Sequence, residues 1–246
     1  GRQDTGEQPV ARIGDKEVGP GYPCFVVSEV GINHGGNLDT ALKLIDVAST
    51  SGCDAVKFQK RMPRVSVPPD QWEIPRETPW GIMPYIEYKE MMEFDLTQYQ
   101  VIDAHCKQQG IPWFASVWDI GSLVFIKENF DVPAFKIPSA CLTNDELVEA
   151  TARQSHLLGK PIILSTGMST MDEVCHAVEV ASRWPKVNLI LLHCNSTYPC
   201  PVPDLNLRVI KTLHWQFPYA VIGYSGPEVG LATTVAAVAL GACMVA

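Results

Sequence analysis

The sequence has no excess of positive charge. It contains 19 lysine and arginine residues against 27 aspartate and glutamate residues, so its formal net charge is −8. Binding to the DNA or RNA backbone depends on clustered cations that displace counterions from phosphates. We therefore expect no nucleic-acid partner, although a local basic pocket for a small anion is compatible with this balance.

The sequence also lacks a long apolar run. None approaches the roughly 20 residues that a membrane-spanning helix needs. The longest candidate covers residues 231–246, follows Pro227 and Gly230, and predicts a buried helix followed by a strand. The first residues are polar and do not form a signal-peptide pattern. We expect no membrane partner.

Cysteine motifs are missing as well, although the chain has eight cysteines. There is no CxxC pair and no His/Cys spacing of the kind that binds zinc. Most of the cysteines lie in or beside apolar runs, where reduced, buried thiols are the usual state. Because disulfides belong to oxidising compartments, this pattern favours a cytoplasmic protein. The cysteines in apolar surroundings are Cys24, Cys53, Cys141, Cys194 and Cys243.

Eight short apolar runs recur along the 246 residues. They are apolar nearly throughout, as expected for parallel strands that are covered on both faces. Longer helical patterns lie between them, and repeated β–α units imply right-handed crossovers. Eight such strands favour a closed (β/α)8 barrel, or TIM barrel, over an open sheet. The expected strands are Phe25–Gly31, Ala55–Gln59, Trp113–Trp118, Ala134–Pro138, Pro161–Thr166, Asn188–Cys194, Ala220–Ser225 and Ala242–Ala246.

Capping residues mark the ends of several helical segments. Asn37 and Asn144 suit helix N-caps, and Gly110 suits a C-cap. The expected helices are Leu38–Ser51, Asp95–Gln109, Asn144–Gln154, Met171–Arg183, Asn206–Phe217 and Gly230–Leu240.

Two stretches fall outside the β–α rhythm. Residues 1–22 predict a small N-terminal hairpin or cap, which leaves residues 23–246 for the barrel. Residues 60–94 are rich in Pro, Trp and Glu, and a loop of that length is usually functional or a lid. A barrel has a helix after its eighth strand, so we expect these residues to be a barrel truncated within or just after that strand.

Lys57 and Lys136 lie inside apolar strands, and no acidic residue is adjacent to either. A buried ammonium group is costly unless an anion meets it, so the two lysines indicate a ligand with carboxylate or phosphate groups. Two alternatives remain open at this point. Each lysine could pair with a barrel carboxylate such as Glu29, or one could form a Schiff base, as in an aldolase.

Glu29 is the best candidate for a general acid or base, because it lies near the end of the first apolar strand, two residues before Gly31. The alternative is a structural carboxylate that holds Lys57 or a backbone amide. His34 and His193 also follow strands, but two isolated histidines do not make a metal site. For His193, direct catalysis and hydrogen-bonding support are both open.

Several of these segments together resemble the sialic acid synthase family. This family comprises the synthases of N-acetylneuraminate, N-acylneuraminate-9-phosphate, legionaminic acid and pseudaminic acid. The resemblance covers nearly the whole chain, and the first two motifs are specific when found in this order. The matching stretches are Ser28–Gly36, Gly52–Gln59, Phe135–Ser139, Ile163–Met168, Leu192–Pro199, Ile222–Gly226 and Val235–Ala242.

The resemblance implies a reaction and its substrates. Phosphoenolpyruvate would attack the aldehyde carbon of an N-acylated hexosamine such as N-acetylmannosamine, water would add at the enol carbon, and phosphate would leave. Glu29 corresponds to the carboxylate near the reacting centre, and Lys57 and Lys136 to the groups that hold the anions. The substrate-binding residues expected from the resemblance are Asn33, Gln59, Ser139, Ser165, Ser196, Tyr198 and Ser225.

The sequence departs from the family pattern in its metal ligands. Family members bind a divalent metal, Mn or Mg, through a histidine where this chain has Pro227, and through a second histidine after strand eight. We therefore expect no metal-ligating residue in this chain. We likewise expect the family's C-terminal antifreeze-like domain to be absent from these residues, while the resemblance implies the family's homodimer. A degenerate barrel that binds a sugar or anion without turnover is thus a third interpretation, beside the synthase and the aldolase.

Overall fold

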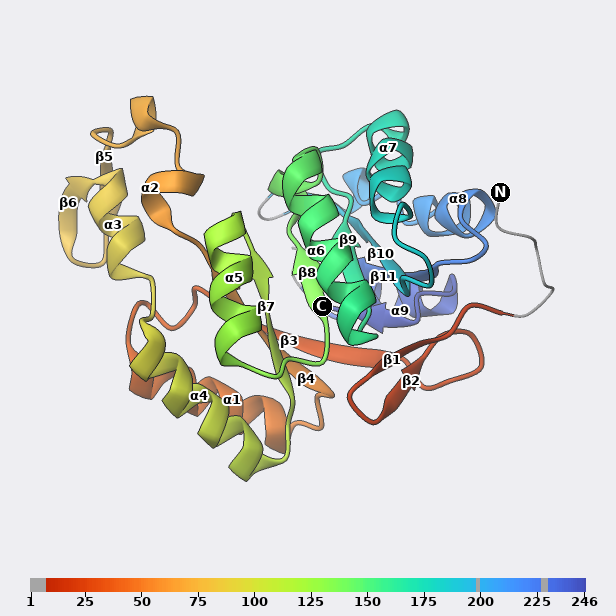
Figure 1. The fold of residues 1–246 in the computed structure, drawn as a ribbon, viewed down its shortest axis with the longest axis horizontal. Coiled ribbons are helices and arrows are strands. Elements are labelled where there is room, and N and C mark those ends of the chain that lie inside the picture. The colour runs from red at the N-terminus through yellow and green to blue at the C-terminus, as the bar shows by residue number, and fades with distance from the viewer. Residues whose placement is uncertain (1–7, 198–199, 227–229) are drawn as a thin grey trace. The chain divides into compact units, whose positions relative to one another are not determined.

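The computed structural model of the chain describes residues 8–197, 200–226 and 230–246. Its main feature is a closed barrel of eight strands, hydrogen-bonded in the order β10-β11-β12-β3-β4-β7-β8-β9 (Figure 1). The strand pairs described within it are parallel. Helices follow the strands along the chain, so the expected (β/α)8 fold is confirmed.

All eight expected strands are present, and none of their boundaries differs from expectation by more than two residues. Burial explains this agreement, because β4, β7 and β9 are buried along almost their whole length and read as unbroken apolar runs. The strands are β3 (Phe25–Gly31), β4 (Ala55–Lys60), β7 (Trp113–Val117), β8 (Phe135–Ile137), β9 (Ile162–Ser165), β10 (Leu189–Cys194), β11 (Val221–Ser225) and β12 (Met244–Val245).

The chain divides into two compact units: Gly1–Val27 with Pro133–Ala246, and Ser28–Val132. In the first unit, strands β8 to β12 pair in succession, and α6 (Asp145–Leu158) and α7 (Met171–Ala181) lie side by side beside them (Figure 1). α8 (Val209–Gln216) packs on β10 and β11.

In the second unit, β4 and β7 run parallel from Val56↔Trp113 to Lys60↔Val117. α1 (Leu38–Thr50) and α4 (Leu96–Gln109) lie side by side against them (Figure 1), and a hydrogen bond from Ser49 Oγ to the carbonyl of Gln109 joins the two helices. On β4, Phe58 therefore faces α4, whereas Lys57 and Gln59 lie on the opposite face.

The expected caps form where the sequence placed them. Asn37 accepts a hydrogen bond from the backbone of Thr40, and Asn144 accepts one from Leu147. α4 begins with a full capping box and ends at Gly110 in the left-handed conformation, which glycine adopts at little cost.

Three expectations about helices are wrong. α6 continues four residues beyond Gln154, to Leu158, because the glycine that ends it is Gly159. α9 (Ala232–Ala239) was expected to be buried, but Leu231 is 80% exposed and only Ala237 of the helix is buried. The sequence pattern also missed α5 (Ile120–Asn129), whose β-branched and aromatic residues resemble a strand. Asp119 caps α5, and burial of Leu123 and Ile126 stabilises it.

Residues 60–94, expected to be a long loop, contain ordered elements. α2 (Pro63–Ser66), the 3-10 turn Pro69–Gln71, the hairpin β5 (Pro75–Thr78) to β6 (Gly81–Pro84) and α3 (Tyr85–Met91) follow one another. Contacts of α3 with α2 and with both hairpin strands hold them together as a small subdomain (Figure 1). These elements are short, so their sequences carry little periodicity.

Near the N-terminus, β1 (Ala11–Ile13) and β2 (Lys16–Val18) pair as an antiparallel hairpin. The eight cysteines are present as thiols. Within the described ranges, no helix is both long enough and apolar enough to cross a bilayer.

Replacing Asp95 with alanine tests the capping box of α4. The Asp95 side chain accepts from Gln98 N and the Gln98 side chain accepts from Asp95 N, both at 2.9 Å, and the change removes the first bond and loosens the second. We expect Asp95→Ala to lower the free energy of unfolding by about 1 kcal/mol in urea titrations. Thr97→Ala, at an exposed site on the same helix, should change it by less than about 0.5 kcal/mol. Equal effects of the two changes would contradict the assigned cap.

Candidate functional site

Glu29 on β3 and Lys57 on β4 form a close ion pair in the second unit. Lys57 Nζ lies 2.5 Å from Glu29 Oε2 and donates a hydrogen bond to Ser116 Oγ on β7 at 2.8 Å. The lysine side chain is 6% exposed, whereas the glutamate side chain is 38% exposed. The buried ammonium is therefore satisfied, while the carboxylate still faces solvent. With Gln59, these residues make up the carboxylate cluster.

The Lys57 side chain points toward this cluster because side chains alternate along a strand. Successive side chains on a strand point to opposite faces, so Lys57 and Phe58 point in opposite directions. Phe58 makes edge contacts with Tyr99 of α4 and with Trp113, each at a ring-centroid distance of 6.1 Å. The aromatic contacts fix one face of β4 against α4 and leave the other face for the ammonium group.

Gly31 allows the close packing around the carboxylate. Its φ is 51°, and a Cβ added there would lie 2.5 Å from Glu29 Oε1 and 3.3 Å from Gln59 Nε2. A larger residue would meet both backbone strain and a steric clash. The geometry therefore gathers the Glu29 carboxylate and the Gln59 amide over one glycine.

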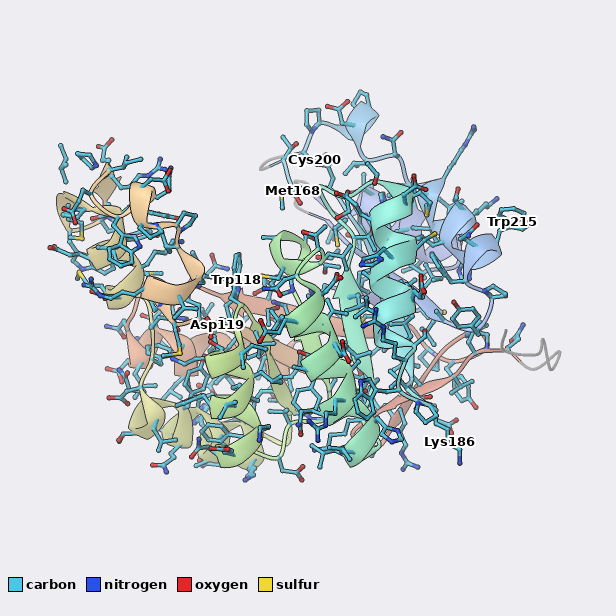
Figure 2. The ribbon with its side chains drawn as sticks, turned by 45° about the horizontal axis from the view of Figure 1, so that its top comes forward. Trp118, Asp119, Met168, Lys186, Cys200 and Trp215 are labelled. Carbon is cyan, nitrogen blue, oxygen red and sulfur yellow. The ribbon has the colours of Figure 1, made fainter. Side chains whose placement is uncertain are left out.

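Gln59 links the cluster to a buried arginine. Its Oε1 accepts a hydrogen bond from the guanidinium group of Arg61. That guanidinium lies 4.2 Å from the ring centroid of Trp118, which Figure 2 shows with Asp119 close to the segment that carries α2. Asp119 fixes this segment by accepting from the backbone of Met62 at 2.7 Å.

Asn33 lies beside Glu29 but contacts its backbone. Its Nδ2 donates to the carbonyl oxygen of Glu29 at 3.3 Å, and the residue is exposed. Asn33 therefore shapes the turn after β3 and presents a polar side chain to solvent.

A second group of polar side chains, the serine cluster, lies in the first unit. Lys136 on β8 donates hydrogen bonds to Ser165 Oγ at 2.5 Å and to the carbonyl of Ile137 at 3.1 Å. Ser139 Oγ accepts from the backbone N–H of Gly167 at 3.0 Å. Lys136 and Ser165 are each 4% exposed. Ser139 and Ser196 thus lie at Gly167, and Ser165, two residues before that glycine, holds the buried ammonium group of Lys136.

The two clusters repeat one local geometry. On β4, Lys57 stands opposite Phe114, and its serine partner is two residues further on. On β8, Lys136 stands opposite Ile163, and its partner Ser165 is again two residues further on. Residues two apart on a strand share a face, so the register of each strand pair brings the hydroxyl under the ammonium.

Gly167 packs tightly against the hydroxyl groups of the serine cluster. A Cβ added there would lie 2.8 Å from Ser139 Oγ and would overlap Ser196 Oγ. The missing side chain therefore lets two hydroxyls from different loops approach one backbone amide. Ser225 is half-buried at the end of β11, opposite Cys194, and Tyr198 lies outside the described residues.

The strand-end histidines serve the structure. His193 is buried, and its Nε2 lies 2.7 Å from the carbonyl oxygen of Leu205. Burial lowers its pKa, against the opposing effect of that hydrogen bond. His34 stacks on Phe94 at 4.2 Å, and burial lowers its pKa to about 4. Of the two roles open for His193, the geometry favours hydrogen-bonding support.

The described residues do not fit a divalent metal. Among them, no three His, Cys, Asp or Glu side chains come together as a possible ligand set. In the carboxylate cluster, Glu29 is the acidic residue, and its Oε2 faces an ammonium group. Pro227, which stands where the family is expected to have a metal histidine, lies outside the described residues.

Sequence reasoning missed three contributors to these clusters. Ser116 was visible as a strand-end serine, but only the pairing of β4 with β7 shows that it accepts from Lys57. Gly167 lies in the matching stretch Ile163–Met168 but was not a candidate residue, and its close packing depends on Ser139 from another loop. Arg61 lies in residues 60–94, which were expected to be a loop, and its contact with the ring of Trp118 appears only in the fold.

The fold and the two clusters define a (β/α)8-barrel enzyme domain with buried lysines and strand-end hydroxyls. Residues 44–246 match the model of the NeuB family. The chain therefore belongs to the NeuB family, the sialic acid synthases that its motifs resemble.

Named relatives support this membership. The chain is 37% identical over 227 residues to the N-acetylneuraminate-9-phosphate synthase of Homo sapiens. This alignment covers 92% of this chain and 61% of the relative. It is 33% identical over 225 residues to the N,N'-diacetyllegionaminic acid synthase of Campylobacter jejuni, covering 90% and 66%. The chain thus spans about three fifths to two thirds of the length of these curated relatives.

A solved structure shows the same architecture. The N-acetylneuraminic acid synthetase of Leptospira borgpetersenii serovar Hardjo-bovis, crystallised in complex with citrate, superposes with a TM-score of 0.84 at 29% identity. The match covers 97% of this chain and 78% of that one.

Loss of Glu29 should destabilise the protein more than loss of Lys57. Without Glu29 the ammonium stays buried with Ser116 as its remaining described partner, whereas a carboxylate left without Lys57 can be hydrated. We expect Glu29→Ala to cost roughly 1–3 kcal/mol of unfolding free energy, and Lys57→Met clearly less. Glu29→Gln, which keeps an acceptor oxygen, serves as the control. If Lys57→Met lowered the urea midpoint more than Glu29→Ala, the burial of Lys57 would not explain the relative stability losses.

Gly167→Ala tests the close packing in the serine cluster. The new methyl group would displace the Ser139 and Ser196 hydroxyls, so we expect a loss of roughly 1–3 kcal/mol in unfolding free energy. Adding Ser196→Ala removes one clashing atom, so the double variant should be more stable than the sum of the single losses predicts. Ser182→Ala, at an exposed position in the same unit, is the control. Strict additivity would contradict the contact.

Proposed function

We propose that this chain carries the barrel part of a phosphoenolpyruvate-dependent synthase. The reaction condenses phosphoenolpyruvate with an N-acylated hexosamine of the N-acetylmannosamine type. It forms a sialic-acid-type nonulosonic acid and releases phosphate. Membership of the NeuB family supports this proposal, as do relatives whose names specify N-acetylneuraminate-9-phosphate and legionaminic acid synthesis.

One observation carries the proposal: two strands each bury a lysine whose ammonium group is bonded to a serine hydroxyl. Phosphoenolpyruvate has a carboxylate and a phosphate, and both need fixed cations and donors. A buried ammonium oriented by strand register does not have to reorganise when charge develops on a leaving phosphate. A purely structural core would place apolar side chains at these positions.

The roles of individual residues follow from their surroundings. In the first unit, Lys136 and the hydroxyls of Ser139, Ser165, Ser196 and Ser225 would bind the oxygens of phosphoenolpyruvate. The backbone N–H of Gly167 already donates to Ser139 and orients that hydroxyl.

In the second unit, Glu29 is the group suited to handle the proton of the attacking water, because its carboxylate is partly exposed and held by Lys57. Lys57 would contribute positive charge to the same step. Asn33, Gln59 and Tyr198 would line the sugar side.

The ion pair weighs against the aldolase alternative. A Schiff base needs a neutral lysine amine whose lone pair attacks a carbonyl. Lys57 Nζ instead lies 2.5 Å from the Glu29 carboxylate and donates to Ser116 Oγ, so the nitrogen is already engaged by two partners. This ion pair is also the structural pairing that was considered for Glu29. Glu29 would therefore orient Lys57 whether or not it also transfers a proton.

The metal and the homodimer rest on the family resemblance, and the cellular compartment rests on the thiols. The family resemblance implies Mn or Mg, but the described residues do not provide its ligands, and no step here depends on it. A homodimer is expected from the family alone. Eight thiols suit a reducing compartment, so we place the enzyme in the cytoplasm.

Phosphate release tests this function. The protein would be incubated with phosphoenolpyruvate, Mn²⁺ and N-acetylmannosamine, with or without a 6-phosphate, while phosphate and nonulosonic acid are quantified. We expect Lys57→Met, Lys136→Met and Glu29→Gln each to lower kcat by about 100-fold or more. Lys107→Met, at an exposed ion pair with Asp103, should leave kcat unchanged.

A separate measurement distinguishes the aldolase. Borohydride reduction in the presence of pyruvate should yield no covalent adduct at Lys57 or Lys136. An adduct, or phosphate release that does not depend on the hexosamine, would refute the proposed reaction.

A further inference from the structure

A cavity of about 500 Å³ lies at the amino-terminal ends of β3 and β12. Cys24 and Cys243, which directly precede these two strands, both line it. The turn of residues 19–22, His214 of α8 and Val238 near the end of α9 contribute to its wall. The serine cluster of the same unit lies at the carboxyl ends of β8 and β9, so the cavity is a separate feature at the other end of these parallel strands.

Strand register places the two cysteines opposite each other. Phe25 pairs with Met244 and Val26 with Val245, in parallel. The backbone N–H of Phe25 donates to the carbonyl of Cys243 at 2.9 Å, so the ladder extends to the cysteines. Neighbouring strands lie about 4.8 Å apart, and a disulfide needs Cα atoms that are roughly 4.4–6.8 Å apart. The cysteines therefore stand within disulfide range, with both side chains at one cavity.

The two thiols differ in their surroundings. Cys24 is half-buried, whereas Cys243 is 8% exposed. The Cys243 thiol donates a hydrogen bond to the carbonyl oxygen of Gly241 at 3.4 Å, and His214 Nε2 lies 3.1 Å from the same oxygen. Burial raises the pKa of the Cys243 thiol. Because the thiolate is the reactive form, Cys24 is the thiol suited to react first and Cys243 the one suited to follow.

We propose that Cys24 and Cys243 form a redox-modification site, which a hydroperoxide that enters the cavity converts to a disulfide. The Cys24 sulfur attacks one oxygen of hydrogen peroxide, the O–O bond breaks, and the departing oxygen takes up the thiol proton and leaves as water. The Cys243 sulfur then attacks the Cys24 sulfenic acid, so that the S–S bond forms, the S–O bond breaks and a second water leaves. Two thiols are oxidised, and one peroxide is reduced to two water molecules.

This disulfide would join the first barrel strand to the last. β12 has two residues, which pair with Phe25 and Val26 of β3, and its described pair with β11 is Tyr224↔Val245. A covalent link between residues near opposite ends of the chain restricts the unfolded state strongly. Oxidation should therefore stabilise barrel closure at its shortest strand, and a reducing compartment would return the pair to thiols.

Peptide mapping of the full chain tests the site. Reduced and peroxide-treated protein would be alkylated, digested with trypsin and analysed by mass spectrometry. Lysine and arginine positions place Cys24 in peptide 17–43 and Cys243 in peptide 212–246, each of which has no other cysteine. We expect a peroxide-dependent link between these two peptides that dithiothreitol reverses. The oxidised protein should melt about 4 °C or more above the reduced protein.

Single variants assign the roles of the two thiols. Cys243→Ser should abolish the link and increase trapping of the Cys24 sulfenic acid by dimedone about threefold or more, whereas Cys24→Ser should leave Cys243 unmodified. Cys175→Ser, at a half-buried cysteine of α7, is the matched control and should keep the link. The parent protein alone decides the proposal, so it does not depend on how the variants fold. An oxidised parent without this link, or with Cys24 joined to a different cysteine, would overturn it.

Discussion

An ammonium group inside an apolar strand must find acceptors, since a buried charge without them costs several kcal/mol. Lys57 and Lys136 meet this constraint in the same way, with a serine two residues beyond the position that each faces on the next strand. A one-residue slip of either strand would turn that hydroxyl to the opposite face. The polar clusters therefore depend on the register of the barrel, and the register is favoured in turn by the bonds that satisfy the lysines.

Both clusters pack closely around a glycine, because polar atoms of neighbouring residues occupy the space that a side chain at that glycine would fill. At Gly31 that space holds the Glu29 carboxylate, and at Gly167 it holds the Ser139 and Ser196 hydroxyls. Close packing fixes polar groups before a ligand arrives, which reduces the reorganisation that binding or catalysis requires.

The eight strands, the Asn37 and Asn144 caps and the Gly110 terminus were all predictable, because burial on both faces and local hydrogen bonds leave direct marks in a sequence. α5 was not, because its Val and Phe residues resemble a strand and only packing makes them helical. The exposure of α9 was also missed, since apolar composition does not reveal which faces are covered. Among the candidate site residues, Glu29, Lys57 and Lys136 were predicted from their places in the strands and Ser139 and Ser165 from the family resemblance, whereas Ser116 and Arg61 were not predicted.

The sequence alone determined the class of fold, the family and the residues that carry charge into apolar strands, because each depends on patterns within short segments. Tertiary structure decided which groups touch. It paired Lys57 with Glu29, which the sequence offered only as an alternative to an external anion, and it bonded His193 to a backbone carbonyl. It also turned residues 60–94 into a folded subdomain. Such contacts join residues that are far apart in the chain, and their energies depend on strand register and burial, which no local pattern encodes.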